Sequence, residues 1–562
     1  MSRLLTMKNL VIEGFQEEQW GDIVLGVDVH VDRGEVLGLI GESGAGKSTI
    51  GIASMAYCRD GCRIVSGSIK FDDLELTTAT DDQMRSIRGV RISYVAQSAA
   101  ASFNPAHHII DQYVEAPVKH GIMSRAEAEK GARDLYSRFD LPDPDNIGDR
   151  YPHQVSGGQL QRAMVAMAMA CKPDLIIFDE PTTALDVTTQ IEVLATIKDA
   201  IRELNSAAIY ITHDLAVVSQ VADRIIVLRH GQLVEEGGTR EMLANPKQDY
   251  TRALLSVRKG QTEKIKHAEE GKSLLKVNNV SAAYANRVPV LQDVNVTVTR
   301  GKTIAVVGES GSGKSTLARV ITGLLPPITG TIEFDGQELP AKFSDRDREM
   351  LRRVQMIIQM PDVALNPRQK IKQVLGRPLE FYFGMRGEEK RQRVSQLMEQ
   401  IELPERYVNR FPSELSGGEK QRICIAKALA AEPNLIICDE VTSALDQLVA
   451  EDILKLLQRL QNELSMSYLF ITHDLATVKA ISDEIVVMLQ GRVVEYGTRD
   501  EVLAPPHHEY TELLLASVPE MDPDWLDNLL KTRVGALLRE GPASEHAVKK
   551  NNKLSKFGAT GL

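Results

Sequence analysis

Two glycine-rich segments contain the residue types that bind nucleotide phosphates: GESGAGKST at Gly41–Thr49 and GESGSGKST at Gly308–Thr316. Their glycines let successive backbone N–H groups point at phosphate oxygens, and the start of a following helix adds its dipole. In this pattern the lysine reaches the β- and γ-phosphates, and the next serine offers its hydroxyl to Mg²⁺. The residues expected to contact nucleotide are Gly41, Ser43, Gly44, Gly46, Lys47, Ser48 and Thr49, with Gly308, Ser310, Gly311, Gly313, Lys314, Ser315 and Thr316.

An acidic pair follows a short apolar run at two places. Asp179 and Glu180 end LIIFDE, and Asp439 and Glu440 end LIICDE. A carboxylate at the end of a buried strand can hold Mg²⁺, which is the role expected of Asp179 and Asp439. The next carboxylate can orient and deprotonate the water that attacks a γ-phosphate, which makes Glu180 and Glu440 candidate general bases. The alternative for each is a salt-bridged acidic residue at a strand end.

A Ser-Gly-Gly turn precedes a helical stretch in VSGGQ at Val155–Gln159 and in LSGGE at Leu415–Glu419. A serine and free N–H groups at a helix start can bind an anion, although an ordinary helix N-cap has the same sequence. The candidate anion-binding residues are Ser156, Gly157, Gly158, Ser416, Gly417 and Gly418.

The order and spacing of these motifs indicate an internal duplication. ITHDLA at Ile211–Ala216 also recurs, at Ile471–Ala476. The phosphate-loop lysines are 314 − 47 = 267 positions apart, and the histidines are 473 − 213 = 260 apart, as are the serines of the turns and the acidic pairs. The repeat predicts two domains, a linker and a tail. The boundaries are 1–257, 258–273 for the polar linker, 274–518, and 519–562 for the tail.

The elements that must position these residues follow from the apolar pattern. Each half alternates short apolar strands with helical stretches, which predicts an α/β fold. Continuous apolar runs predict strands buried on both faces, leading into the phosphate loops and the acidic pairs. These strands are expected at Glu35–Ile40, Leu175–Phe178, Thr303–Val307 and Leu435–Cys438.

The composition is that of an ordinary globular chain: 43% of residues are apolar and the formal net charge is −11, which argues against a nucleic-acid partner. The apolar run Ala163–Cys171 is much shorter than the ~20 residues that span a bilayer. The N-terminus lacks the features of a secretion signal. We therefore expect a cytoplasmic protein with reduced cysteines that reaches any membrane through a partner.

Together these motifs resemble those of the ABC ATPase superfamily: Walker A loop, LSGGQ-like signature, Walker B acidic pair, D-loop and Thr-His-Asp switch, each present twice. The resemblance implies two tandem P-loop NTPase cassettes, each a RecA-like core with a helical subdomain and an antiparallel β-subdomain. It also implies that each ATP lies between the Walker motifs of one half and the signature of the other. One ATP would then lie between Gly41–Thr49 and Ser416–Gly418, and the other between Gly308–Thr316 and Ser156–Gly158.

The same resemblance assigns further roles. Gln97 and Gln359 match the glutamines that touch Mg²⁺ and the attacking water, and His213 and His473 match the switch histidines at the γ-phosphate. Residues of two further kinds are implied: the D-loop residues Asp186 and Asp446, and an adenine-stacking aromatic in each half, which is Tyr284 in the second and Phe15 in the first, with Trp20 as the alternative to Phe15. Departures at Val155, Glu419 and Val441 remove no catalytic group, so both sites are expected to turn over.

Further segments are similar to those of dipeptide, oligopeptide and nickel-type ABC importer ATPases in their fused form. They are Ser102–Pro105 (SFNP), Ala364–Pro367 (ALNP), Asn245–Leu255 (NPKQDYTRALL) and the later PPHHEYTELLL. This resemblance implies two transmembrane permease subunits, an extracytoplasmic substrate-binding protein, and a peripheral place on the cytoplasmic face of the inner membrane. Many relatives hold an iron–sulfur cluster, but no cysteine follows Cys438, so none is expected here.

Two alternatives stay open. The cargo of such an importer could be a sugar, an opine or a metal chelate rather than a peptide. A soluble twin-cassette ATPase acting on ribosomes or DNA is the alternative of another class, and the short linker and acidic net charge argue against it.

Overall fold

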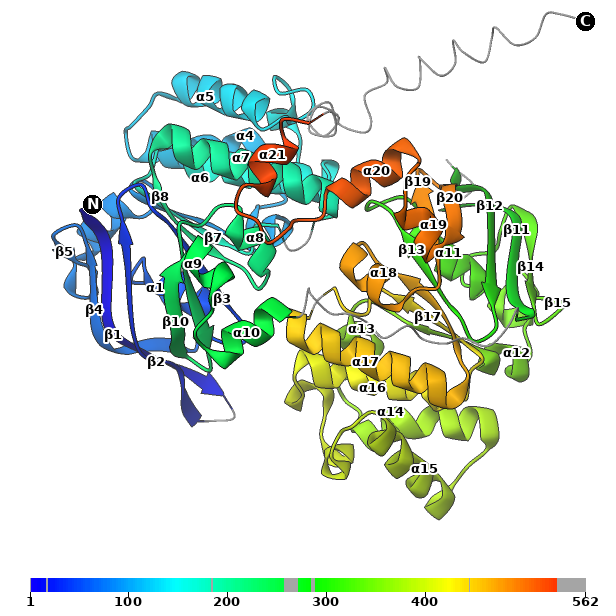
Figure 1. Cartoon of the computed structure of the whole chain (residues 1–562). Coiled ribbons are helices and arrows are strands. Elements are labelled where there is room, and N and C mark those ends of the chain that lie inside the picture. Colours follow the sequence, from blue (N-terminus) through cyan, green and yellow to red (C-terminus); the bar gives the residue numbers. More distant parts are fainter. Residues whose placement is uncertain are drawn as a thin grey trace, which may run out of the picture. The chain divides into compact units, whose positions relative to one another are not determined.

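The computed structural model describes residues 2–16, 19–182, 185–256, 271–284, 289–443 and 445–532. Residues 257–270, which include most of the predicted linker 258–273, and residues 533–562 of the predicted tail lie outside this described part. The chain forms two compact units (Figure 1), one made of Met1–Leu255 with the segment that begins at Ala516, the other of Ser256–Leu515.

The first unit is built around a mixed sheet whose strands are ordered β10-β9-β3-β8-β7-β6. All neighbouring strands are parallel except β9 and β10. The strands are β3 (Val36–Gly41), β6 (Ile92–Val95), β7 (Leu175–Asp179), β8 (Ala207–Ile211), β9 (Arg224–Arg229) and β10 (Gln232–Gly238). Strands β3, β7 and β8 are buried along their whole length, as their continuous apolar sequences predict.

An antiparallel sheet of order β2-β1-β4-β5 packs against this core. Its strands are β1 (Arg3–Gln16), β2 (Gln19–Asp32), β4 (Cys62–Phe71) and β5 (Leu74–Glu75). The helices of the unit are α1 (Lys47–Ala53), α2 (Asp81–Ile87), α3 (Ala99–Ser102), α4 (Ile109–Lys119), α5 (Arg125–Arg138), α6 (Gly157–Met169), α7 (Val187–Leu204), α8 (Leu215–Ser219), α9 (Thr239–Ala244) and α10 (Asp249–Ser256). Helices α4, α5 and α6 pack on one another and form the helical subdomain.

The second unit repeats this plan. Its antiparallel sheet has the order β12-β11-β14-β15, and its mixed sheet has the order β16-β17-β18-β13-β19-β20. The strands are β11 (Ser273–Ala283), β12 (Pro289–Thr299), β13 (Thr303–Val307), β14 (Thr329–Phe334), β15 (Gln337–Glu338), β16 (Val354–Ile357), β17 (Leu435–Asp439), β18 (Ser467–Ile471), β19 (Glu484–Leu489) and β20 (Arg492–Thr498). The helices are α11 (Lys314–Ile321), α12 (Arg348–Arg353), α13 (Pro361–Ala364), α14 (Ile371–Pro378), α15 (Gly387–Gln400), α16 (Gly417–Leu429), α17 (Gln447–Leu464), α18 (Leu475–Ile481), α19 (Arg499–Leu503) and α20 (Glu509–Ala516).

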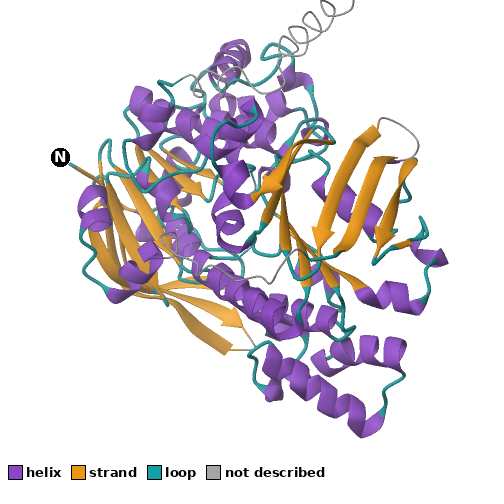
Figure 2. Cartoon of the chain, turned by 45° about the vertical axis from the view of Figure 1, so that its right-hand side comes forward, coloured by secondary structure: helices purple, strands orange, loops and turns teal. Residues whose placement is uncertain are grey.

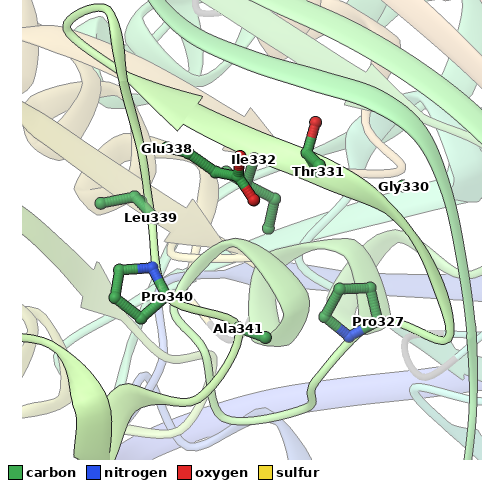
Figure 3. Close-up of a pocket in the computed structure, with 8 residues that line it drawn as sticks. All are labelled: Pro327, Gly330, Thr331, Ile332, Glu338, Leu339, Pro340 and Ala341. Atoms are coloured by element: carbon green, nitrogen blue, oxygen red, sulfur yellow. The ribbon is translucent and has the colours of Figure 1, made fainter.

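Both units thus combine a mixed sheet, an antiparallel sheet and a group of helices (Figure 2), and the predicted α/β fold of two tandem cassettes is confirmed. The second unit also holds a hollow of about 250 Å³ lined by residues around β14 and β15 (Figure 3). Glu338 is the one charged side chain among its lining residues, and none of them belongs to a predicted nucleotide motif.

The segment after α20 returns to the first unit, where α21 (Trp525–Leu529) lies beside α7 and α8 (Figure 1). The side chain of Gln220, at the end of α8, is buried and holds this segment. Its Nε2 donates to the carbonyl oxygens of Glu520 at 2.7 Å and Asp522 at 3.0 Å, and its Oε1 accepts from the Leu526 N–H at 3.1 Å. Ion pairs flank the contact, from Lys198 to Asp527 at 2.9 Å and from Arg240 to Asp524 at 2.6 Å.

Replacing Gln220 with leucine should loosen this C-terminal segment, because two partly buried carbonyl groups and one buried N–H would lose their partner. Leaving buried polar groups unpaired costs about 1–3 kcal/mol each. We expect faster cleavage between residues 516 and 532 in limited proteolysis, with the first cassette itself still resistant. The exposed Gln232 provides the control, since Gln232→Leu should leave the cleavage rate unchanged. Equal rates for both variants would show that Gln220 does not hold the segment.

Candidate active sites

The first glycine-rich segment connects β3 to α1 and forms a tight loop. Gly41 has a φ of 149°, and a Cβ there would lie 2.1 Å from the carbonyl oxygen of Leu228, so only glycine fits. Lys47, the first residue of α1, is 6% exposed and curls over the loop. Its ammonium group donates to the carbonyl oxygens of Gly41 at 2.8 Å and Glu42 at 2.9 Å. The loop is therefore held in shape, with a buried positive charge at its centre.

The second segment has the same geometry between β13 and α11. Gly308 has a φ of 148°, and its Cβ position lies 2.2 Å from the carbonyl oxygen of Met488. Lys314 donates to the carbonyl oxygens of Gly308 at 2.8 Å and Glu309 at 2.7 Å. Both segments thus have the strand, loop and helix order that a phosphate-binding loop requires.

Each loop meets the first residue of an acidic pair. Ser48 Oγ donates to Asp179 Oδ1 at 2.7 Å, and Ser315 Oγ donates to Asp439 Oδ1 at 3.0 Å. Both carboxylates are buried, at 2% and 8% exposed. A hydroxyl and a carboxylate beside a phosphate-binding loop are the hard oxygen donors that Mg²⁺ prefers, so the residues present fit that ion.

The second acidic residue, Glu180 in the first unit, turns away from the strand. It has a φ of 48°, an unusual value for a residue with a side chain, and its N–H donates to the Ile211 carbonyl at 2.9 Å. Oxygen Oε2 of its carboxylate accepts a hydrogen bond from Gln97 Nε2 at 2.9 Å. The other oxygen, Oε1, lies 3.3 Å from His213 Nδ1. Strands β6, β7 and β8 are adjacent and parallel, so these three residues meet where the strands end.

The second unit forms the same cluster. Glu440 has a φ of 51°. Its Oε2 accepts a hydrogen bond from Gln359 Nε2 at 2.7 Å, and its Oε1 lies 3.4 Å from His473 Nδ1. Burial works against the charged forms, but hydrogen bonding between the partners outweighs it: the pKa of Glu440 lies below its usual range and the pKa of His473 lies above it. Glu440 is therefore an ionised carboxylate near neutral pH, as a general base must be.

The Ser-Gly-Gly turns begin helices in both units. Ser156 Oγ accepts from the Gln159 N–H at 3.3 Å, and Gln159 Oε1 accepts from the Ser156 N–H at 3.1 Å. Ser416 and Glu419 make the same reciprocal pair at 3.3 and 2.7 Å, so glutamate at 419 keeps the cap that glutamine makes. Both serines are thus helix N-caps, and the anion-binding role of these turns stays a prediction.

Further predicted residues lie at helix starts or on the antiparallel sheets. Asp186 and Asp446 cap α7 and α17, accepting from backbone N–H groups at 3.0 and 3.1 Å. Tyr284 is 42% exposed, and its hydroxyl lies 3.3 Å from Thr316 Oγ1 at the start of α11. Phe15 and Trp20 are both exposed, and their ring centroids are 5.3 Å apart. The two alternatives for the first aromatic thus share one location.

Tyr94 was not predicted from the sequence. Its hydroxyl donates to Asp179 Oδ2 at 2.5 Å, and burial together with the charge of Asp179 raises the pKa of Tyr94 well above 10. Arg59 Nη2 lies 3.7 Å from the same oxygen. The one available signal was the difference between YVAQ before the first acidic pair and MIIQ before the second.

Comparison with known families agrees with this geometry. Residues 24–183 and 291–443 match the family described as "ABC transporter", so both phosphate loops, both acidic pairs, Gln97 and Gln359 lie within matched regions, and His213 and His473 follow them. The chain belongs to the ABC transporter family. Residues 494–542 match a second family, "Oligopeptide/dipeptide transporter, C-terminal region". This ABC protein is therefore an ATP-binding ATPase with tandem cassettes of the oligopeptide/dipeptide type.

Curated relatives extend over nearly the whole ABC chain. The glutathione import ATP-binding protein GsiA of Escherichia coli (strain K12) is 36% identical over 92% of this chain and 90% of its own length. The protein of the same name from Pectobacterium atrosepticum is 35% identical over 93% of this chain and 90% of its own length. A solved cbiO1 structure from Clostridium perfringens is 29% identical, covers 47% of this chain and 98% of its own, and has a TM-score of 0.38. In the described part of the chain, no helix is long and apolar enough to span a bilayer.

Proposed function

We propose that both cassettes bind and hydrolyse ATP with Mg²⁺, and that this hydrolysis energises an importer for peptides or related small solutes. The observation that carries the hydrolytic part is the pair of matched clusters, Gln97–Glu180–His213 and Gln359–Glu440–His473. Each places an acceptor carboxylate beside a phosphate-binding loop, with an amide and an imidazole that fix its orientation. The departures at Glu419 and Val441 leave both clusters complete.

The residues divide the work between them. When nucleotide binds, Lys47 and Lys314 give up their hydrogen bonds to loop carbonyls and donate to β- and γ-phosphate oxygens instead. Ser48 with Asp179, and Ser315 with Asp439, hold Mg²⁺, which neutralises phosphate charge when bound. Glu180 and Glu440 orient the attacking water and accept its proton. His213 and His473 hold these carboxylates in place and face the γ-phosphate, and Gln97 and Gln359 position the water and approach the metal.

The importer role is supported by the relatives and by the C-terminal region. The relatives named above are glutathione import proteins, and residues 494–542 match the C-terminal region of oligopeptide/dipeptide transporters. We therefore propose two transmembrane permease subunits and an extracytoplasmic substrate-binding protein as partners. The chain would then work at the cytoplasmic face of the inner membrane. Glutathione is itself a short peptide, so small peptides are the proposed class of cargo.

Uptake assays in cells that lack the chromosomal gene test this proposal. We expect the intact chain to restore uptake of labelled glutathione or of di- to tetrapeptides, and the Glu180→Gln/Glu440→Gln variant to restore none. Tagged protein taken from membranes should carry two multi-span proteins with it. Uptake of a sugar or opine alone would overturn the peptide assignment but keep the importer. Sedimentation with ribosomes, without membrane partners, would overturn the importer.

A further inference from the structure

The carboxylate proposed to hold Mg²⁺ in the first cassette is anchored at both oxygens. Asp179 Oδ1 accepts from Ser48 Oγ at 2.7 Å, and Asp179 Oδ2 accepts from the Tyr94 hydroxyl at 2.5 Å. The phenol and serine approach from different elements, β6 and α1. A carboxylate with one donor on each oxygen cannot rotate without breaking a charge-assisted hydrogen bond.

In the part of the second cassette that the structure describes, Asp439 has a donor on one oxygen only. Among the described residues, Ser315 alone donates a hydrogen bond to the Asp439 carboxylate, on Oδ1 at 3.0 Å. The position of Tyr94 is taken by Met356. Tyr94 pairs with Ile177 across β6 and β7, and Met356 pairs with Ile437 across β16 and β17. Each partner lies two residues before the acidic residue, so the two positions are equivalent in register, and a thioether has no proton to donate.

Positive charge is present near both carboxylates, so the hydrogen bond from Tyr94 is what separates the two cassettes. Arg59 Nη2 lies 3.7 Å from the oxygen that Tyr94 contacts, although the arginine is 63% exposed and solvent weakens its effect. In the second cassette the positive charges of Lys314 and Arg319, both on α11, act on Asp439. The two cassettes therefore share their loops and catalytic clusters but differ in what surrounds the metal-binding carboxylate.

We propose that Tyr94 is a positioning residue that pre-orients Asp179, so that the first cassette binds Mg²⁺–nucleotide at a lower Mg²⁺ concentration than the second. This inference rests on the proposed role of Asp179 and Asp439 in holding Mg²⁺. Groups that hydrogen-bond a metal ligand typically contribute tenfold to hundredfold to metal affinity. Pre-orientation has this effect because the carboxylate loses less freedom when the metal binds.

The test measures ADP binding to the full chain over a series of free Mg²⁺ concentrations, by titration calorimetry. Lys314→Ala weakens binding to the second cassette, so that the tighter binding in the titration reports the first cassette, and Lys47→Ala makes it report the second. We expect Tyr94→Phe to raise the half-saturating Mg²⁺ concentration of the first cassette about tenfold, without changing ADP affinity in EDTA. Met356→Tyr should lower that concentration in the second cassette, and the control Met356→Leu should not.

Three results would count against the proposal, and they differ in what they overturn. An unchanged Mg²⁺ requirement in Tyr94→Phe removes the positioning role. An equal loss of ADP affinity in EDTA means that Tyr94 acts on the fold or the nucleotide instead. An unchanged Mg²⁺ requirement in Asp179→Asn removes the metal role on which the inference rests, and with it this part of the proposed function.

Discussion

Replacing Glu180 and Glu440 together with glutamine should lower ATP turnover at least about a hundredfold and leave ATP bound. A positioned general base contributes about 10²–10⁴ in rate, and an amide cannot take the proton of the attacking water. Glutamine keeps the shape of the side chain and an oxygen that can accept from Gln97 or Gln359, which now lie 2.9 and 2.7 Å from the carboxylates. Steady-state phosphate release and retention of radiolabelled ATP measure the two effects.

A matched pair of controls lies in the same two cassettes. Glu203 and Glu463 are exposed glutamates near the ends of α7 and α17, paired with Arg138 at 2.6 Å and Arg459 at 3.5 Å. Replacing both with glutamine should leave turnover within about twofold, because exposed ion pairs contribute little. The single variants Glu180→Gln and Glu440→Gln show how much of the total ATP turnover each cassette contributes. Turnover in the double variant close to that of the unaltered chain would refute the general-base assignment.

Replacing Lys47 with alanine should weaken nucleotide binding to the first cassette about tenfold to hundredfold, and Lys314→Ala should do the same in the second. Hydrogen bonds to charged groups are worth about 1.5–3 kcal/mol, and each 1.4 kcal/mol is a factor of ten in affinity. Both lysines are 6% exposed, and their ammonium groups already pair with loop carbonyls. The lost lysine therefore costs phosphate contacts and the support of the loop.

Calorimetric titration with ADP separates this effect from the loss of catalysis. The glutamate variants should bind normally and hydrolyse slowly, whereas the lysine variants should bind weakly in the altered cassette. Lys70 and Lys276 are exposed lysines on the antiparallel sheets, so alanine at either position provides the control. Unchanged affinity in Lys47→Ala and Lys314→Ala would contradict the placement of these lysines at the phosphates.

Much of the site could be predicted from the sequence because its parts are local. The glycine-rich loop, the lysine and the serine follow one another in Gly41–Thr49, and Asp179 and Glu180 are neighbours. The meeting of Gln97, Glu180 and His213 needs the tertiary fold, but adjacent parallel strands end at the same edge of a sheet. The resemblance to ABC ATPases predicted that Gln97 and His213 lie at the nucleotide site. In the structure both side chains contact Glu180.

Other features depend on contacts that no local pattern encodes. The hydrogen bond from Tyr94 to Asp179 follows from the register of β6 against β7, which the motifs leave open. Gln220 reads as an ordinary polar residue after a short helix, yet its partners are about three hundred positions later in the chain, as the bond to Glu520 shows. The residues paired with α7 and α8 lie in the segment predicted from the sequence as the tail, 519–562.

The most direct test of two working cassettes is the number of ATP molecules trapped per chain by the Glu180→Gln/Glu440→Gln variant. The protein is incubated with excess ATP and Mg²⁺, freed of unbound nucleotide by rapid desalting, and assayed for nucleotide after denaturation. Two complete clusters predict two molecules of ATP per chain, falling to one when Lys47→Ala or Lys314→Ala is added. One molecule or fewer in the glutamate double variant would contradict the claim that both cassettes bind ATP.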